Sequence, residues 1–177
     1  MNPLKWLSED FQNLRALYVN QLRVLLSAEE QIVRALPNMV NRANDVQLRQ
    51  AFQSHLLETE DHIKRLEQIL VAEKSSNSAV TSVEPVKCKA ISMLVDEAED
   101  LIVDARDAWV RDAALIAAAQ RVEHYEIASY GTVRQWAILM GDMQAAELLD
   151  KTLKEEGHAD HLLSSISERV NPKAKAA

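Results

Sequence analysis

Glycine and proline are scarce in this sequence, with 3 Gly and 4 Pro among 177 residues. Both residues interrupt helices, whereas Ala, Leu, Glu, Gln, Lys and Arg, which are abundant here, favour them. The composition therefore predicts an all-α protein. At this length we expect a single domain with a sizeable core.

Cysteine pairs, long apolar runs and an apolar leader are also lacking. The single Cys88 excludes an intramolecular disulfide and indicates a reducing compartment; we expect it to be an ordinary helical residue. No apolar run approaches the roughly 20 residues that a membrane helix needs, and the N-terminal MNPLKWLSEDF has no signal-peptide core. The net charge of −7, with both signs interspersed, argues against nucleic acid as a partner. These absences predict a cytoplasmic protein that binds neither membrane nor nucleic acid.

Apolar residues that recur at three- and four-residue steps predict the helices of the first half. The first helix is expected to begin after an N-cap at Ser8, and Pro37 should kink or end it. A second helix is expected over about 46–73. After the serine-rich stretch KSSNSAVTSVEP, a shorter helix is expected from Pro85 to about Ala105.

Two further long helices are predicted in the second half. The first follows a break at DAWVRD, where either Asp107 or Asp112 can serve as the cap. Gly141 followed by Asp142 predicts a tight turn into the last helix, which is expected to reach about Val170.

Four long helices with a short one in the middle connection predict an antiparallel four-helix bundle with a long crossover. We expect this bundle to include residues 1–171, with residues 172–177 forming a short basic tail that frays.

The most unusual stretch is 113–131, AALIAAAQRVEHYEIASYG, an apolar helical run that contains Glu123 and Glu126. Residues three apart lie on the same side of a helix, and here that side is otherwise apolar. Burying an ionised carboxylate without a partner costs several kcal/mol or more. We therefore expect a cation or a hydrogen-bond donor beside these two glutamates.

Each of the other long helices also carries a glutamate at an apolar or apolar-edge position: Glu29, Glu58 and Glu155. Glu155 and His158 have the i, i+3 spacing that lets a carboxylate and an imidazole converge on one ion. Oxygen and imidazole ligands suit iron or manganese, and two divalent cations would offset four or five carboxylates almost completely. The pattern predicts a di-metal site between the helices.

Four segments, SAEEQIVRAL, HLLETEDHIKRLE, RDAALIAAAQRVEHYEIASYGT and TLKEEGHADHLL, closely resemble the YciE/YciF-type stress-response proteins. These proteins are a branch of the ferritin-like superfamily related to rubrerythrin. The resemblance implies a ferritin-like four-helix bundle, a homodimer, a di-iron site, and a ferroxidase or peroxide-handling role with O2 or peroxide as the oxidant.

The superfamily pattern of Glu, Glu-x-x-His, Glu and Glu-x-x-His implies a set of ligands in this sequence. The second helix departs from that pattern because the residue three after Glu58 is Asp61, so His62 or His55 is expected to supply the nitrogen ligand. The third-helix Glu123 resembles the additional glutamate of rubrerythrin-like sites. With His62 as the preferred nitrogen ligand, the predicted metal ligands are Glu29, Glu58, His62, Glu123, Glu126, Glu155 and His158.

Two alternatives remain open at this level. In place of a metal, the interior acids could pair with Arg15, Arg121 or Arg134, and the protein would then be a helical dimer with a structural or interaction role. Tyr130 could donate to a ligand carboxylate or relay an electron, but we expect it to be an ordinary buried tyrosine whose hydroxyl is hydrogen-bonded. Gly157, in mid-helix, indicates a local bend or close packing, or it is a glycine that the structure does not require.

Overall fold

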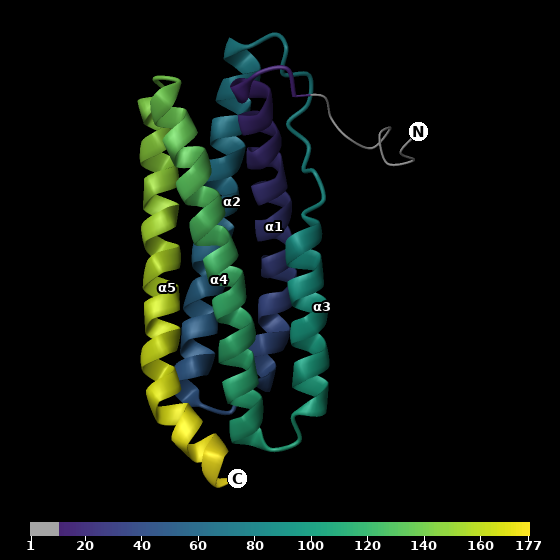
Figure 1. The fold of residues 1–177 in the computed structure, drawn as a ribbon, viewed down its shortest axis with the longest axis vertical. Helices are drawn as coiled ribbons and strands as arrows, with labels where there is room; N and C mark the ends of the chain where they lie inside the picture. Colours follow the sequence, from purple (N-terminus) through teal and green to yellow (C-terminus); the bar gives the residue numbers. More distant parts are fainter. Residues whose placement is uncertain (1–10) are drawn as a thin grey trace.

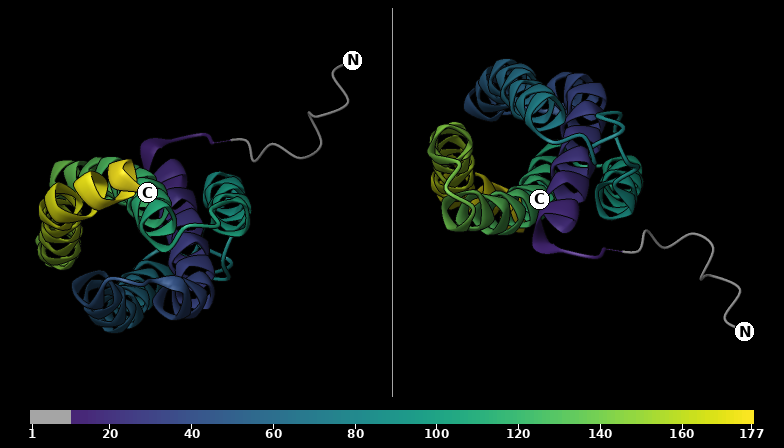
Figure 2. Two further views of the ribbon diagram at one scale, coloured as in Figure 1. Left: turned by 90° about the horizontal axis from the view of Figure 1, so that it is seen from below. Right: turned by 90° about the horizontal axis from the view of Figure 1, so that it is seen from above.

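The computed structural model describes residues 11–177, and each regular element in that range is an α-helix. The elements are α1 (Leu14–Arg42), α2 (Val46–Ser76), α3 (Lys89–Asp104), α4 (Ala108–Leu139) and α5 (Met143–Ala176). Each long helix runs antiparallel to the long helices beside it (Figure 1). Along the long axis, α1, α2, α5 and α4 surround a common core, and α3 lies outside it against α1 and α4 (Figure 2). The all-α prediction is confirmed.

Short polar side chains begin the four long helices, because each can accept hydrogen bonds from N–H groups that the first turn leaves free. The predicted turn between α4 and α5 is confirmed: Gly141 has a φ of 78°, and the Asp142 side chain accepts from the N–H of Ala145. The predicted cap Ser8 lies outside the described residues. The capping residues of α1, α2, α4 and α5 are Asn13, Asp45, Asp107 and Asp142.

Asp112, the other candidate cap for α4, has a different role. It is buried, and its two carboxylate oxygens accept hydrogen bonds from the backbone N–H groups of Asn44 and Asp45, each at 2.8 Å. The side chain therefore ties the α1–α2 connection to the first turns of α4.

Two prolines lie within helices and do not end them, so of the alternatives for Pro37 the helix end is excluded. Pro37 lies inside α1, which continues to Arg42, and Pro172 lies inside α5, which continues to Ala176 instead of ending near Val170. Proline removes one helical hydrogen bond, but packing of the buried side chains around it stabilises the helix. Residues 172–176 of the predicted basic tail are thus helical.

The crossover between α2 and α3 is bonded to α1. The N–H of Val86 donates to the carbonyl of Arg23 at 3.1 Å, and the N–H of Cys88 donates to Ser27 Oγ at 3.2 Å. Because these groups bond to α1, α3 begins only at Lys89 and not at the predicted Pro85. Cys88 is the buried residue at the N-cap position of α3, not a residue within it.

Two apolar clusters fill the core, one toward each end of the long helices. One cluster includes Leu36, Phe52, Leu115 and Leu163, and the other includes Leu22, Leu66, Val133 and Leu149. Between these two sets, each long helix also carries at least one buried ionisable residue. Along residues 11–177, no helix is long and apolar enough to span a membrane.

Candidate metal centre

Between the two apolar clusters, every long helix directs ionisable side chains into the interior. We call this set the polar layer, and all of its members are buried. Their spacing follows from helix geometry, because residues three or seven apart return to the same face. The polar layer consists of Glu29 from α1, His55 and His62 from α2, Glu123 and Glu126 from α4, and Glu156 from α5.

Glu29, His62 and Glu156 form the first potential metal-binding group. One ligand atom from each lies within 4.8 Å of the others. His62 Nδ1 is 2.9 Å from Glu156 Oε1 and 3.4 Å from Glu29 Oε1. Three helices thus bring two carboxylates and an imidazole to one point.

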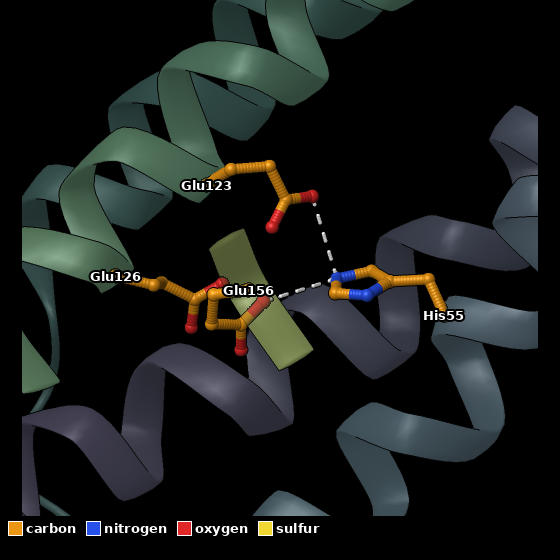
Figure 3. Close-up of side chains that lie close together, drawn as sticks. All are labelled: His55, Glu123, Glu126 and Glu156. Atoms are coloured by element: carbon orange, nitrogen blue, oxygen red, sulfur yellow. Dashed lines mark ion pairs between the residues drawn. The ribbon is translucent and has the colours of Figure 1, made fainter. Parts of the chain in front are cut away.

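His55, Glu123, Glu126 and Glu156 form the second group, again with one ligand atom each within 4.8 Å of the others. Figure 3 shows these side chains converging from α2, α4 and α5. His55 Nε2 lies 3.4 Å from Glu123 Oε1 and 3.9 Å from Glu156 Oε2. Glu156 belongs to both groups, so its two oxygens can serve two neighbouring ions.

Many polar atoms of the layer have no hydrogen-bond partner in the described structure. These atoms include both oxygens of Glu126 and Glu156, one oxygen each of Glu29 and Glu123, and both ring nitrogens of His55. The close approach of His62 Nδ1 to Glu156 is not aligned as a hydrogen bond. Since buried charges without partners cost several kcal/mol, this interior must hold either protons or cations.

His62 is held in place from outside the layer. Its Nε2 lies 3.0 Å from Glu155 Oε2, and Arg65 binds both oxygens of Glu155 while also donating to Thr152. A carboxylate on one imidazole nitrogen fixes the proton there and leaves the other nitrogen for a metal. Glu155 and Arg65 therefore turn Nδ1 of His62 toward Glu29 and Glu156.

Tyr130 holds Glu29 in a similar way, because its buried hydroxyl donates a hydrogen bond to Glu29 Oε1. Burial, followed by the negative charge of Glu29, raises the pKa of Tyr130 well above its ordinary value of 10, so the hydroxyl remains a donor. Of the alternatives left open for Tyr130, the structure shows a buried tyrosine whose hydroxyl donates to Glu29.

Burial shifts the protonation of the carboxylates. It raises the pKa of Glu126 and of Glu123 well above the ordinary value, and repulsion from the neighbouring glutamates adds to the effect. Burial also raises the pKa of Glu29. Burial opposes ionisation of Glu156 as well, but the two nearby imidazoles outweigh it and lower the pKa of that residue. Without a cation, Glu29, Glu123 and Glu126 thus bind their protons more tightly than an exposed glutamate does, whereas Glu156 does not.

The pKa values of the two imidazoles in the layer are also raised. Burial alone would lower the pKa of His55, but the negative charge of Glu123, the contact with Glu58 and the charge of Glu156 raise it to about 9. Burial alone would also lower the pKa of His62, but the close carboxylates of Glu156 and Glu29 outweigh it and raise the pKa to about 10. Near neutral pH, a metal ion must therefore displace protons from the ligands that it binds.

The structure brings some of the predicted ligands together and leaves others outside. Glu29, His62, Glu123 and Glu126 belong to the two groups. Three predicted ligands do not: Glu58, whose side chain is 36% exposed, Glu155, which is paired with Arg65, and His158, which is exposed.

Glu156 and His55 belong to the polar layer but are not among the predicted ligands. The buried line of α5 passes through Leu149, Glu156 and Leu163, each seven residues after the last, and so selects Glu156 over its neighbour Glu155. This seven-residue repeat was readable in the sequence. The sequence offers His55 and His62 as alternatives, but both face the interior because they are also seven residues apart.

The polar layer contains the same residue types as the pattern that the resemblance implies, four carboxylates and two imidazoles, in a different distribution. Both imidazoles come from α2. The residue three after Glu156 is the buried Ala159, so α5 supplies no imidazole within this layer. α4 contributes two glutamates to the layer, whereas α2 contributes no carboxylate to it.

The arginines considered as alternative partners for the acids pair elsewhere. Arg15 binds Glu73, Arg121 binds Glu97, and Arg134 binds Asp150. Within the described residues, none of these three ion pairs neutralises a glutamate of the polar layer.

Comparisons with known proteins match almost the whole chain. A family model described as "Domain of unknown function (DUF892)" matches residues 13–176. Protein YciF of Escherichia coli (strain K12) is 39% identical over 167 residues, which cover 94% of this chain and 98% of YciF.

Two solved structures are also similar. The crystal structure of the E. coli stress protein YciF matches with a TM-score of 0.84 and 39% identity, covering 92% of this chain and 99% of that one. The structure of YcfI from Rhodopseudomonas palustris matches with a TM-score of 0.81 and 39% identity, covering 89% and 96%. The resemblance seen in the sequence is confirmed: the chain belongs to the DUF892 family and is a homologue of the stress protein YciF.

Proposed function

We propose that this protein is a ferritin-like four-helix bundle that binds two metal ions, iron in the first instance, in its polar layer. The observation that carries the proposal is the convergence of two buried ligand groups that share Glu156. The ions would be held by Glu29, His62 and Glu156 on one side and by His55, Glu123, Glu126 and Glu156 on the other.

Charge supports two divalent ions over one. The layer contains four glutamates, which together carry four negative charges when ionised, and two imidazoles that are neutral as ligands. Two divalent cations would balance these charges completely, whereas one would leave two charges uncompensated in a buried site. Such a balance removes the cost of the unpartnered carboxylate oxygens.

The donor set supports iron or manganese. Carboxylate oxygens together with imidazole nitrogens suit these ions, and the layer contains no thiolate to favour zinc. A bound iron pair would supply the electrons for reduction of O2 or peroxide. The protein's own residues hold and orient the ligands: Tyr130 fixes Glu29, Glu155 fixes His62, and the apolar clusters on both sides exclude water.

A small apolar pocket supports an oxidant such as O2. It has a volume of about 40 Å³, lies beneath α3, and is lined by residues including Leu94, Val95 and Val122 together with His55 and Glu123. Apolar cavities exclude water and admit small apolar molecules. The pocket thus gives O2 an apolar route to the second ligand group.

The homologue supports a proposal for the biological role. YciF is described as a stress protein of E. coli. We propose that this protein likewise acts in bacterial stress, in the cytoplasm and as a homodimer, by oxidising Fe(II) with O2 or peroxide.

Anaerobic titration of the metal-free protein with Fe(II), followed by equilibrium dialysis, tests the proposal. We expect about two ions per chain for the wild type, and a loss of both for Glu156→Gln because Glu156 belongs to both groups. Glu168→Gln, on the exposed face of α5, is the matched control and should bind as the wild type does.

Addition of O2 or peroxide to the loaded protein should then oxidise Fe(II) faster than buffer does. Binding of less than one Fe(II) per chain by the wild type would overturn the proposal. The polar layer would in that case be a protonated structural element of a non-enzymatic helical protein.

A further inference from the structure

A pocket between α2 and α5 connects the surface to the polar layer. Its volume is about 60 Å³. From α2 it is lined by Ala51, Phe52, Ser54, His55 and Glu58; from α5 by His158, Ala159, Leu162 and Leu163; and from α4 by Glu123. Residues of the interior and residues of the surface therefore line the same space.

The polar groups in this pocket are graded from exposed to buried. Glu58 is 36% exposed and His158 is also exposed, whereas His55 and Glu123 are buried. Neither ring nitrogen of His55 has a hydrogen-bond partner, and neither has Oε2 of Glu123. The deep end of the pocket thus presents buried polar atoms that are free to accept a ligand.

His55 connects the two ends. Its Nδ1 lies 3.7 Å from Glu58 Oε2, toward the mouth, and its Nε2 lies 3.4 Å from Glu123 Oε1, in the interior. One imidazole ring thus spans the distance between a half-buried carboxylate and a buried one.

We propose that the pocket between α2 and α5 is the route by which a divalent cation reaches the polar layer, with Glu58 and His158 as its transient ligands at the mouth. This inference rests on the proposed function. A cation that leaves water needs oxygen or nitrogen ligands at each stage, because an unliganded ion in an apolar space is costly. The pocket beneath α3 is mainly apolar. Besides the same His55 and Glu123 at the layer, only Asn38 and Glu99 offer oxygen or nitrogen side-chain ligands along its walls.

This route gives a role to two predicted ligands that lie outside both groups. Glu58 and His158 act before the ion is bound and not at its final position. Their removal should therefore slow uptake and leave the final stoichiometry unchanged.

Stopped-flow binding of Co(II) to the anaerobic metal-free protein, followed by its visible absorption, separates these quantities. We expect Glu58→Gln together with His158→Asn to slow uptake about tenfold, the scale of local charge effects on association rates. Ser54→Phe, which fills the pocket without changing charge, should slow uptake as well. Equilibrium stoichiometry should match the wild type in both variants.

Glu60→Gln with His161→Asn is the matched control, because it makes the same chemical changes at exposed positions of α2 and α5 that do not line the pocket. An unchanged uptake rate in the Glu58 and His158 variant would overturn the route. A loss of stoichiometry in that variant would also overturn it, since Glu58 and His158 would then be ligands of the final site. Failure of the wild type to bind Co(II) would instead overturn the proposed function, and the route with it.

Discussion

Replacement of Glu126 by glutamine isolates the electrostatic cost of the polar layer. The side chain is 0% exposed, and neither of its oxygens has a hydrogen-bond partner. Burial, and then repulsion from Glu29, Glu156 and Glu123, raise its pKa well above the ordinary value of 4.5. Glutamine has nearly the same volume but no charge, so the substitution removes the titration and preserves the packing.

The sign and size of the effect follow from proton linkage. A carboxyl whose pKa is higher in the folded protein binds more protons when folded, so its contribution to stability falls as pH rises above the unfolded value near 4.5. The slope is at most about 1.4 kcal/mol per pH unit for one proton. The metal-free Glu126→Gln protein should therefore lose stability less steeply than the wild type, by up to that amount.

His55 and His62 add a slope of the same sign at higher pH. Their folded-state pKa values of about 9 and about 10 exceed the ordinary 6.5, so their stabilisation is complete below 6.5 and is lost as pH rises through the folded values. The comparison is consequently sharpest between pH 5 and 6, where the carboxylates dominate.

Urea unfolding at pH 5, 6, 7 and 8, in the presence of a chelator, measures these slopes. Glu168→Gln serves as the control at an exposed position and should leave the slope unchanged. With Fe(II) in place of the chelator, the wild type should have the higher free energy of unfolding, because it gains binding free energy that the variant lacks. Identical slopes for the wild type and Glu126→Gln would refute the reasoning that Glu126 is a strained, protonated group in the metal-free state.

Three further predictions concern other parts of the molecule. Asp112→Ala should lower the free energy of unfolding by about 3 kcal/mol, measured by urea unfolding, because two backbone N–H groups lose their acceptor. A stability within 0.5 kcal/mol of wild type would contradict this. Gly157→Ala should raise the free energy of unfolding by about 1 kcal/mol, since an added Cβ meets nothing within 4 Å; destabilisation would show that the glycine is required. Val95→Phe, in the pocket beneath α3, should slow oxidation of bound Fe(II) by O2 without altering Fe(II) binding, whereas the exposed control Met93→Phe should oxidise at the wild-type rate; equal rates would exclude the pocket as the O2 route.

The helices were predictable because their signals are local. Three- and four-residue periodicity marks each long helix, and Gly141 followed by Asp142 marks the turn between α4 and α5. The prolines were less informative. Whether a helix continues through Pro37 or Pro172 depends on packing by residues far away in the sequence, and the late start of α3 depends on hydrogen bonds from the crossover to α1.

The candidate site was predictable in kind and only partly in detail. Glu123 and Glu126 were evident because charged residues interrupt an apolar face. Between Glu155 and Glu156, the choice depends on the rotation of α5 about its axis, which a short window leaves uncertain by one residue and the seven-residue repeat resolves. That Arg65 binds Glu155 could not be foreseen, because the two residues lie on different helices.

The polar layer is divided unequally between the two helical hairpins. The α1–α2 hairpin contributes Glu29, His55 and His62, a set with one acid and two imidazoles, whereas the α4–α5 hairpin contributes three acids. Both potential groups take residues from both hairpins, so each group becomes complete only when the two hairpins dock. Metal binding would therefore report the last step of assembly. The two metal ions would link the imidazole-rich hairpin to the acidic one.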